Sequence, residues 1–150
     1  METIYNLLKI EHDQLSNLLR QALQDSSKVS FFKVKLKADP HMMGEERFFY
    51  PVLEGIEELR ELTSQAYKEH NEAKTLIFEI DGMDERDKNR TDKISELKQS
   101  IEHHIEEEEG KVFEIARNVL SQEKAEEIAQ QYIEFKRNYM NRIETGTPLA

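Results

Sequence analysis

Polar residues inside otherwise apolar helical stripes constrain the fold of this chain more than any other feature. Stripes with steps of three and four residues run through four segments, at about residues 3–24, 40–59, 62–80 and from 94 to near 118. Histidine or glutamate takes apolar positions of these stripes at His12, His41, Glu45, His70, His104 and Glu108. Because burying an unpartnered carboxylate is costly, these side chains must meet a neutralising partner.

An internal repeat relates the four segments in pairs. Residues 10–19 align with residues 68–77 through Glu-His-Asp/Asn and a closing aliphatic pair. Residues 41–50 align with residues 104–113 through His, two consecutive Glu and a final aromatic residue. Two similar helix hairpins can pack about a pseudo-twofold axis into a four-helix bundle, in which equivalent positions converge near the centre. We therefore expect the six polar residues to meet there.

The types and spacing of these residues are typical of a two-metal site. Two stripes contain a histidine that is followed four residues later by a glutamate, which places both side chains on one helix face about one turn apart. Two further histidines complete a set of four imidazoles and two carboxylates, suited to two divalent ions such as iron, manganese or zinc. Six side chains cannot fill two octahedral shells, so we expect oxide, hydroxide or water as a bridge and one position open to a small ligand.

Composition excludes several other classes of site. With 5 Gly and 3 Pro in 150 residues, the sequence favours helices and one domain spanning residues 1–150. The absence of Cys excludes disulfides, thiolate zinc sites and iron–sulfur clusters, and the net charge of −10 without a basic stripe argues against a nucleic-acid partner. The longest apolar run, residues 48–53, is too short to cross a bilayer and the amino terminus has no basic leader, so we expect a cytoplasmic protein without membrane contact.

Some helix boundaries have two interpretations. Asp39-Pro40 could start the second helix, or Pro40 could kink a helix already under way. Asp81-Gly82 indicates a helix end, followed by a solvated loop at residues 84–90. Ser121 can cap a fifth helix at about residues 122–143, which either covers an open side of the bundle or makes a groove or homodimer contact. We expect a frayed tail at residues 145–150.

Several polar residues near the stripes are assigned to lesser roles. His103 has a glutamate at the same spacing as the paired histidines, but it lies one residue out of register and is expected to be exposed. Solvated or outer positions around the ligands are expected for Glu46, Glu106, Glu107 and Glu109. Surface positions are favoured for Glu11 and Glu69, with tuning of the site as the alternative, and core packing is favoured for Tyr5, Tyr50 and Tyr67.

These motifs resemble a known family. The hemerythrin HHE cation-binding domain is similar over about residues 4–118, in the ordered motifs Glu11-His12, His41-x3-Glu45-Glu46 with Tyr50-Pro51, Glu69-His70, and His104-Ile105-x2-Glu108-Glu109 with Phe113. The resemblance implies an all-α, up-and-down four-helix bundle at about residues 3–118 with an additional C-terminal helix. It further implies a non-haem di-iron centre with an oxo or hydroxo bridge, for which zinc or manganese could substitute. The family's ligands fall on His12, His41, Glu45, His70, His104 and Glu108.

Two departures from the family's oxygen carriers shape the functional expectation. The carriers have a fifth histidine where this chain has Lys74, and an aspartate where it has Glu108. The resemblance therefore points to the broader HHE group, and a protein that binds or senses oxygen, nitric oxide or iron is favoured over an enzyme. One alternative is a di-iron stress enzyme that reduces peroxide or nitric oxide or repairs iron–sulfur centres. Another is a metal-free or zinc-holding interaction module.

Overall fold

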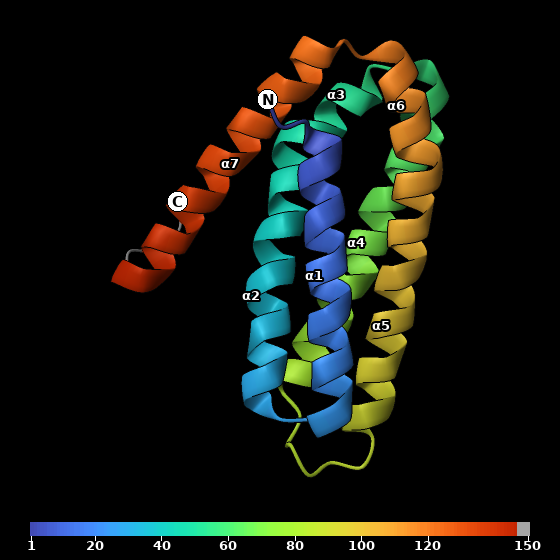
Figure 1. Cartoon of the computed structure of the whole chain (residues 1–150). Helices are drawn as coiled ribbons and strands as arrows, with labels where there is room; N and C mark the ends of the chain where they lie inside the picture. The colour runs from blue at the N-terminus through green and yellow to red at the C-terminus, as the bar shows by residue number, and fades with distance from the viewer. Residues whose placement is uncertain (147–150) are drawn as a thin grey trace.

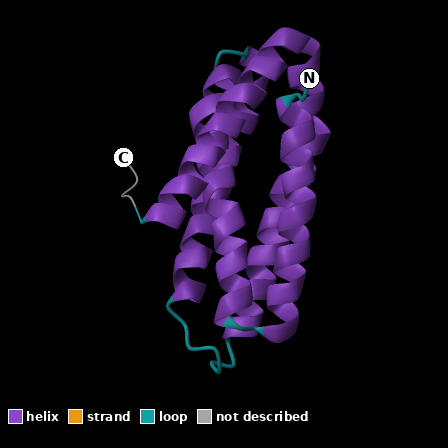
Figure 2. Ribbon diagram, turned by 60° about the vertical axis from the view of Figure 1, so that its left-hand side comes forward, coloured by secondary structure: helices purple, strands orange, loops and turns teal. Residues whose placement is uncertain are grey.

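The structure is a computed structural model that describes residues 1–146, and Figures 1 and 2 show its helices joined by short connections. No strand occurs among these residues. The predicted fraying of the tail falls mostly on residues 147–150, which lie outside the described part of the chain. In order, the elements are α1 (Ile4–Asp25), α2 (Lys28–Gly44), the π-helix η1 (Glu45–Phe49), α3 (Tyr50–Glu54), the 3₁₀ turn η2 (Glu57–Leu59), α4 (Arg60–Asp81), α5 (Arg90–Glu107), the π-helix η3 (Glu108–Val112), α6 (Phe113–Val119) and α7 (Gln122–Thr145).

Four long rods form an up-and-down bundle, as predicted. They are α1, α2 with its continuation through η1 and α3, α4, and α5 with its continuation through η3 and α6 (Figure 1). Helix α1 packs against α2 and α5, and α4 packs against the same two neighbours. The additional helix α7 runs obliquely along the outside of the bundle and contacts α1, α2 and η1. None of the helices in residues 1–146 has the length and apolar character needed to cross a membrane.

Side-chain caps define three of the helix starts. Thr3 accepts a hydrogen bond from the backbone N–H of Asn6 at the start of α1, and Ser27 does the same for Ser30 at the start of α2. Ser121 accepts from the N–H of Lys124 and begins α7, as predicted. These bonds satisfy backbone donors that the first helical turn leaves unpaired.

The second helix starts earlier than the predicted residue 40. Helix α2 begins at Lys28, and Pro40 lies inside it, so the interpretation of Pro40 as a residue within a running helix is right and its interpretation as a helix start is wrong. Phe31, Val34 and Ala38 are buried and continue the stripe toward His41 in steps of three and four. Proline lacks the N–H that would bond to the carbonyl four residues earlier, but the buried stripe continues past this missing hydrogen bond.

Two π-helical segments shift the buried stripe by one residue. In η1 and η3 the N–H of Tyr50 bonds to the carbonyl of Glu45 and that of Phe113 to Glu108, five residues earlier instead of four. Regular steps of three and four residues from His41 and Glu45 would continue through Phe48, Val52 and Ile56, which are only half-buried. The residues that fill the core instead are Phe49, Tyr50 and Leu53. The extra residue in the π-turn therefore rotates the rest of each rod, which alternating three and four steps could not predict.

The loop between α4 and α5 ends in a buried charge. Residues 84–89 are exposed, as predicted for this loop, but Arg90 is 1% exposed and begins α5. Its guanidinium donates to the carbonyls of Ser26, Ile80 and Met83 and lies over the ring of Phe31. Arg90 thus ties the ends of α1 and α4 together where the bundle closes.

The core consists of two apolar clusters with a polar layer between them. One cluster surrounds Leu8, Phe49 and Leu53, and the other surrounds Leu15, Leu19 and Ile77. His12, between Leu8 and Leu15 on α1, lies in the layer that separates them. The fold therefore places the predicted metal site at mid-height of the bundle, closed off at both ends.

Candidate metal centre

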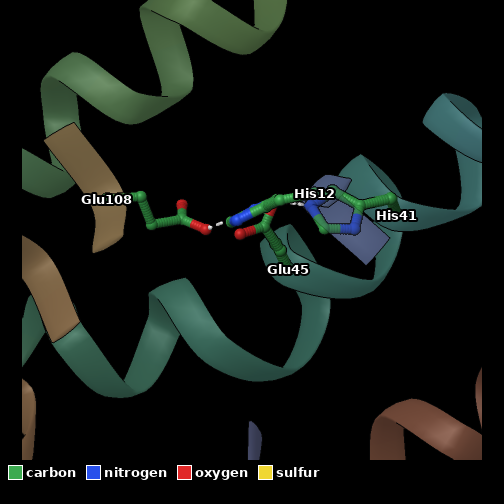
Figure 3. Close-up of side chains that lie close together, drawn as sticks. All are labelled: His12, His41, Glu45 and Glu108. Carbon is green, nitrogen blue, oxygen red and sulfur yellow. Dashed lines mark ion pairs between the residues drawn. The ribbon is translucent and has the colours of Figure 1, made fainter. Parts of the chain in front are cut away.

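Two histidines, one from α1 and one from α2, define a first metal position. One ligand atom from each of His12, His41, Glu45 and Glu108 lies within 4.8 Å of the others, and all four residues are buried. The Nε2 atom of His12 is 3.3 Å from Oε1 of Glu108, and that of His41 is 3.0 Å from Oε1 of Glu45. Figure 3 shows the two imidazoles and the two carboxylates pointing toward one another.

The other two histidines, from α4 and α5, define a second metal position. The Nε2 atom of His70 is 3.3 Å from Oε1 of Glu45, and that of His104 is 3.2 Å from Oε2 of Glu108. Glu108 therefore turns one oxygen toward each position, and Oε1 of Glu45 lies between them. The structure brings all six predicted residues together, with both carboxylates lying between the two pairs of imidazoles.

Each imidazole is oriented by an outer carboxylate. The Nδ1–H groups of His12 and His41 donate to Glu109 and Glu11 at 2.6 and 2.8 Å. Those of His70 and His104 donate to Glu46 and Glu69 at 2.7 and 2.8 Å. A carboxylate on Nδ1 fixes the tautomer that leaves Nε2 free to bind metal, and metal-bound histidines commonly have such a partner.

Two of these outer carboxylates differ from the favoured expectation. Glu11 and Glu69 were expected at the surface, but their side chains are only 13% and 8% exposed. Each directly precedes a histidine of the set and bonds to the histidine of a neighbouring rod. The period of a single helix does not predict which residues pair between helices, although the repeated Glu-His dipeptide was a signal of this pairing. His103 is exposed, as predicted.

Tyr50 packs in the core, as the sequence favoured, and its hydroxyl also reaches the centre. Its hydroxyl donates to Oε2 of Glu108 at 2.5 Å and lies 3.2 and 3.3 Å from the Nε2 atoms of His70 and His104. It is fully buried, because the π-turn of η1 brings it to the same side of the rod as Glu45. Tyr50 is thus a seventh oxygen or nitrogen donor, and it faces the second position.

Lys74 takes no part in the centre itself. It occupies the place of the carriers' fifth histidine, but its ammonium group is half-exposed and pairs with Glu46 at 3.0 Å. Glu46 in turn accepts from His70, so Lys74 acts on the second position only through the outer shell. The inner donor at this position comes instead from Tyr50 on a different helix.

The electrostatics of the centre favour exchange of protons for cations. Burial acts most strongly and lowers the pKa of His41, but the charge of Glu45 and the bond to Glu11 outweigh it and raise the pKa to about 10. The pKa values of His12, His70 and His104 are raised for the same reasons. Burial alone would raise the pKa of Glu108, but its hydrogen bonds hold it well below the usual range. Metal ions entering the centre must therefore displace imidazole protons.

The donor set fits two metal ions. His12 Nε2, Glu45 Oε1 and Glu108 Oε1 are buried without a hydrogen-bond partner, a costly state that a metal ion would relieve. Nitrogen and oxygen ligands bind zinc at about 2.0–2.2 Å, so two ligands at a right angle around such an ion lie about 3 Å apart. The observed separations of 3.0–3.3 Å between each Nε2 and its carboxylate match this spacing.

A small apolar cavity adjoins the centre. Its volume is about 20 Å³, enough for a molecule the size of water. The four site histidines form one wall, and the rest comes mainly from Leu15, Ala38, Met42, Ala73, Ile101 and Ile105. Tyr50 does not line this cavity, which lies beside the core cluster around Leu15, Leu19 and Ile77. The cavity therefore offers space for a small uncharged ligand next to the histidines.

Comparison with known proteins agrees with the geometry. The family model for the hemerythrin HHE cation binding domain matches residues 3–116. The DNA nickase of Nostoc sp. (strain PCC 7120 / SAG 25.82 / UTEX 2576) is 24% identical over 144 residues, which cover 93% of this chain and 41% of that protein. The chain thus spans about two fifths of the length of this relative. No solved structure matches the chain significantly. The match over most of the chain, together with the buried His/Glu cluster, shows that the protein belongs to the hemerythrin HHE cation-binding domain family.

Proposed function

We propose that this protein holds two iron ions between its four rods and binds a small diatomic ligand, oxygen or nitric oxide, as a carrier or sensor. The observation that carries this proposal is the convergence of four Nε2 atoms on two bridging carboxylates, with three of these ligand atoms buried and unpaired. The first position would be held by His12 and His41, and the second by His70 and His104. Glu45 and Glu108 would bridge them.

Charge balance supports two divalent cations. The inner and outer shells contain six carboxylates, of Glu11, Glu45, Glu46, Glu69, Glu108 and Glu109. Two lysines, Lys74 and Lys136, form ion pairs with members of this set. With neutral imidazoles the net charge is −4, which two divalent ions neutralise. A single ion would leave buried negative charge, which is costly.

The ligand chemistry suits iron, with manganese and zinc as substitutes. Imidazole and carboxylate together suit all three ions, and the absence of thiolate removes the strongest preference for zinc. Iron bound here would supply a coordination position at which a diatomic gas can bind reversibly. The cavity beside the histidines supports an uncharged gas as the ligand, because nearly all of the surface that its wall exposes is apolar.

Tyr50 completes the second position in this proposal. Its hydroxyl is as close to His70 and His104 as the carboxylates are, so the phenol oxygen can bind the second ion. Burial and the nearby charges of Glu108 and Glu45 raise its pKa well above the usual value, so it holds its proton until a cation replaces that proton. This donor leaves the first position with the fewer protein ligands and makes it the more open to gas.

The test is metal loading followed by exposure to gas. The metal-free protein is titrated with ferrous iron under argon, its iron content is measured after desalting, and ultraviolet-visible spectra are recorded before and after oxygen or nitric oxide is added. We expect about two irons per chain and a new charge-transfer band on exposure. One iron or none at saturation would overturn the two-metal assignment, and an unchanged spectrum with two irons bound would overturn the gas-binding role.

A measurement of turnover distinguishes the proposed binding role from the alternative of a stress enzyme. The iron-loaded protein is mixed with peroxide or nitric oxide and an excess of reductant, and consumption of the substrate is followed over many equivalents. A carrier or sensor consumes no more than about one equivalent per centre. Sustained consumption that a ligand variant such as His70→Ala abolishes would replace the binding role with an enzymatic one.

A further inference from the structure

Helix α7 lies beyond the part of the chain that the family model matches, yet it reaches the metal centre. The family match ends at residue 116, and α7 begins at Gln122. Tyr132, near the middle of α7, is 1% exposed and donates through its hydroxyl to Oε1 of Glu11. The same hydroxyl is 3.2 Å from Nδ1 of His41. A residue of the outer helix therefore touches both members of one imidazole–carboxylate pair.

Lys136, one turn further along α7, holds the other oxygen of the same carboxylate. Its ammonium group forms an ion pair with Oε2 of Glu11, and the side chains of both residues are largely buried. Although burial raises the pKa of Glu11, His41 and Lys136 lower it to about 2, so the carboxylate stays ionised. Glu11 thus has one oxygen shared by His41 and Tyr132 and the other bound by Lys136, which leaves it little freedom to rotate.

Gly44 makes this approach of α7 possible. A Cβ atom at Gly44 would lie 2.4 Å from a ring carbon of Tyr132, far inside contact distance. Next to it, Phe135 of α7 packs edge-on against Phe48 and lies under the guanidinium of Arg47. The second rod is therefore shaped to accept α7 directly beside His41.

The remaining imidazole–carboxylate pairs have no such support from a separate helix. By the internal repeat, the pair His41–Glu11 corresponds to His104–Glu69, and Glu69 is approached by Gln65, at 3.5 Å on its own helix, and by the exposed His103. Glu46 has Lys74, whose side chain is 42% exposed. Helix α7 thus breaks the symmetry of the outer shell on the side of the first position.

We propose that α7 is a working part of the metal centre, in which Tyr132 and Lys136 fix Glu11, and through it His41, and so set the affinity of the first metal position alone. Both are positioning residues, because neither touches the ligand atoms that face the metal. The proposal rests on the two-metal function proposed above. Loss of an outer-shell partner of a metal-bound histidine typically lowers metal affinity about 10–100-fold.

The test measures the two positions separately. Ferrous iron is titrated under argon into His70→Ala, which retains the first position, and into His12→Ala, which retains the second. Tyr132→Phe/Lys136→Met is then added to each background; phenylalanine keeps the packing on Gly44, and methionine keeps the length of the lysine. We expect affinity to fall by about 10–100-fold in the His70→Ala background and to stay unchanged in the His12→Ala background.

Tyr139→Phe is the matched control. Tyr139 is a buried tyrosine two turns further along α7, and its hydroxyl is not part of the Glu11 network. It should leave iron affinity unchanged in both backgrounds. Thermal unfolding of the metal-free variants checks that the bundle remains folded; if the double change unfolds it, Tyr132→Phe alone is used and a smaller loss in the same background is expected.

Each outcome decides the proposal. Equal iron affinity with and without the α7 changes would overturn it, and an equal loss at both positions would show that α7 only stabilises the bundle. Failure of the wild type to bind two irons refutes the two-metal function itself and is seen before any α7 variant is made. By linkage, iron binding should also slow hydrogen exchange in residues 130–137, and Tyr132→Phe should remove that effect.

Discussion

The two metal positions arise from the same sequence repeat but have different surroundings. Each has two histidines, a share of two carboxylates and an outer carboxylate on every imidazole. At the second position the aromatic residue that ends the repeat is Tyr50, whose hydroxyl reaches the donors. Its counterpart at the first position is Phe113, which stacks on His12 with ring centroids 6.3 Å apart and offers no donor. The first position instead gains a polar contact from outside, through α7.

This difference separates two roles within the site. The repeated residues build a symmetric set of ligands, whereas the residues that depart from the repeat decide how each ion is held. A position with an added phenol oxygen is more fully coordinated. The first position, where an aromatic ring stacks on a histidine and an outer helix contacts Glu11, is more open, and residues outside the ligand set can change its metal affinity. Substitutions can therefore remove either a ligand that both positions share or a residue that belongs to one position.

Removal of a shared ligand should disable both positions. In Glu108→Ala both bridging oxygens are lost, so we expect affinity for both irons to fall by more than about 100-fold, and His12 and His104 lose their buried partner, which costs about 3–5 kcal/mol of stability. Iron content after desalting and thermal unfolding measure the two effects. Glu106→Ala, an exposed change on the same rod, is the control. Retention of two irons in Glu108→Ala would show that Glu108 is not a bridge.

Removal of an unshared ligand should disable one position only. His12→Ala and His70→Ala should each reduce saturation from two irons to one, because each removes one of the two imidazoles at its position. Anaerobic titration with ferrous iron counts the remaining sites. His103→Ala, which changes an exposed histidine, should bind two irons. Loss of both irons in either variant would mean that the positions fill only together.

A rise in pH should increase iron affinity at both positions. The pKa of His41 rises from 6.5 to about 10 on folding, so its imidazolium stabilises the metal-free protein below about pH 6.5, and this stabilisation is lost as the pH rises toward 10. Iron competes with that proton, so iron affinity should increase over the same range. Urea unfolding of the metal-free protein and iron titrations at pH 6, 7 and 8 test both trends. Affinity that is independent of pH would contradict proton displacement.

Replacement of the phenol should have the smallest and most selective effect. Tyr50→Phe retains the ring in the core but removes the oxygen that faces His70 and His104. We expect two irons to remain bound, the second several-fold more weakly, and the visible phenolate-to-iron band of the ferric protein to disappear. Tyr67→Phe, whose ring packs edge-on against Tyr50, should leave the band unchanged. A ferric spectrum without such a band in the wild type would exclude Tyr50 as a ligand.

The ligand set could be predicted because each histidine interrupts a helical period that is otherwise apolar. In α1 and α4 the stripe runs through the metal layer without a shift, so His12 and His70 fell in step with the leucines and alanines around them. The family fold followed from the same spacing. The outer carboxylates were harder to place, because each bonds to a histidine on another rod, and a period within one helix does not report such contacts.

Two further features lay beyond the reach of periodicity. The π-turns insert one residue into the step, so Tyr50 could not be placed beside the donors by counting from Glu45. The contact between Tyr132 and Glu11 joins residues 121 positions apart. Packing of α7 on the bundle was one of two interpretations of its sequence, and the residues that it meets depend on the angle at which it crosses.

The π-turns have a consequence for how the bundle can change. In both rods with a His-x3-Glu pair, the glutamate is the first residue of the π-helix, while the other two rods pass the same level as regular α-helices. The metal layer is thus the level at which these two rods change their rotation relative to a regular helical period. In these two rods the π-turn, and not a continuous helical period, sets the rotation of the residues after it relative to those before it. Deletion of one residue within 46–49 would replace the π-turn by a regular α-helical turn, and because Tyr50 would then follow Glu45 by four residues instead of five, it would stay on the side of the rod that faces the candidate centre.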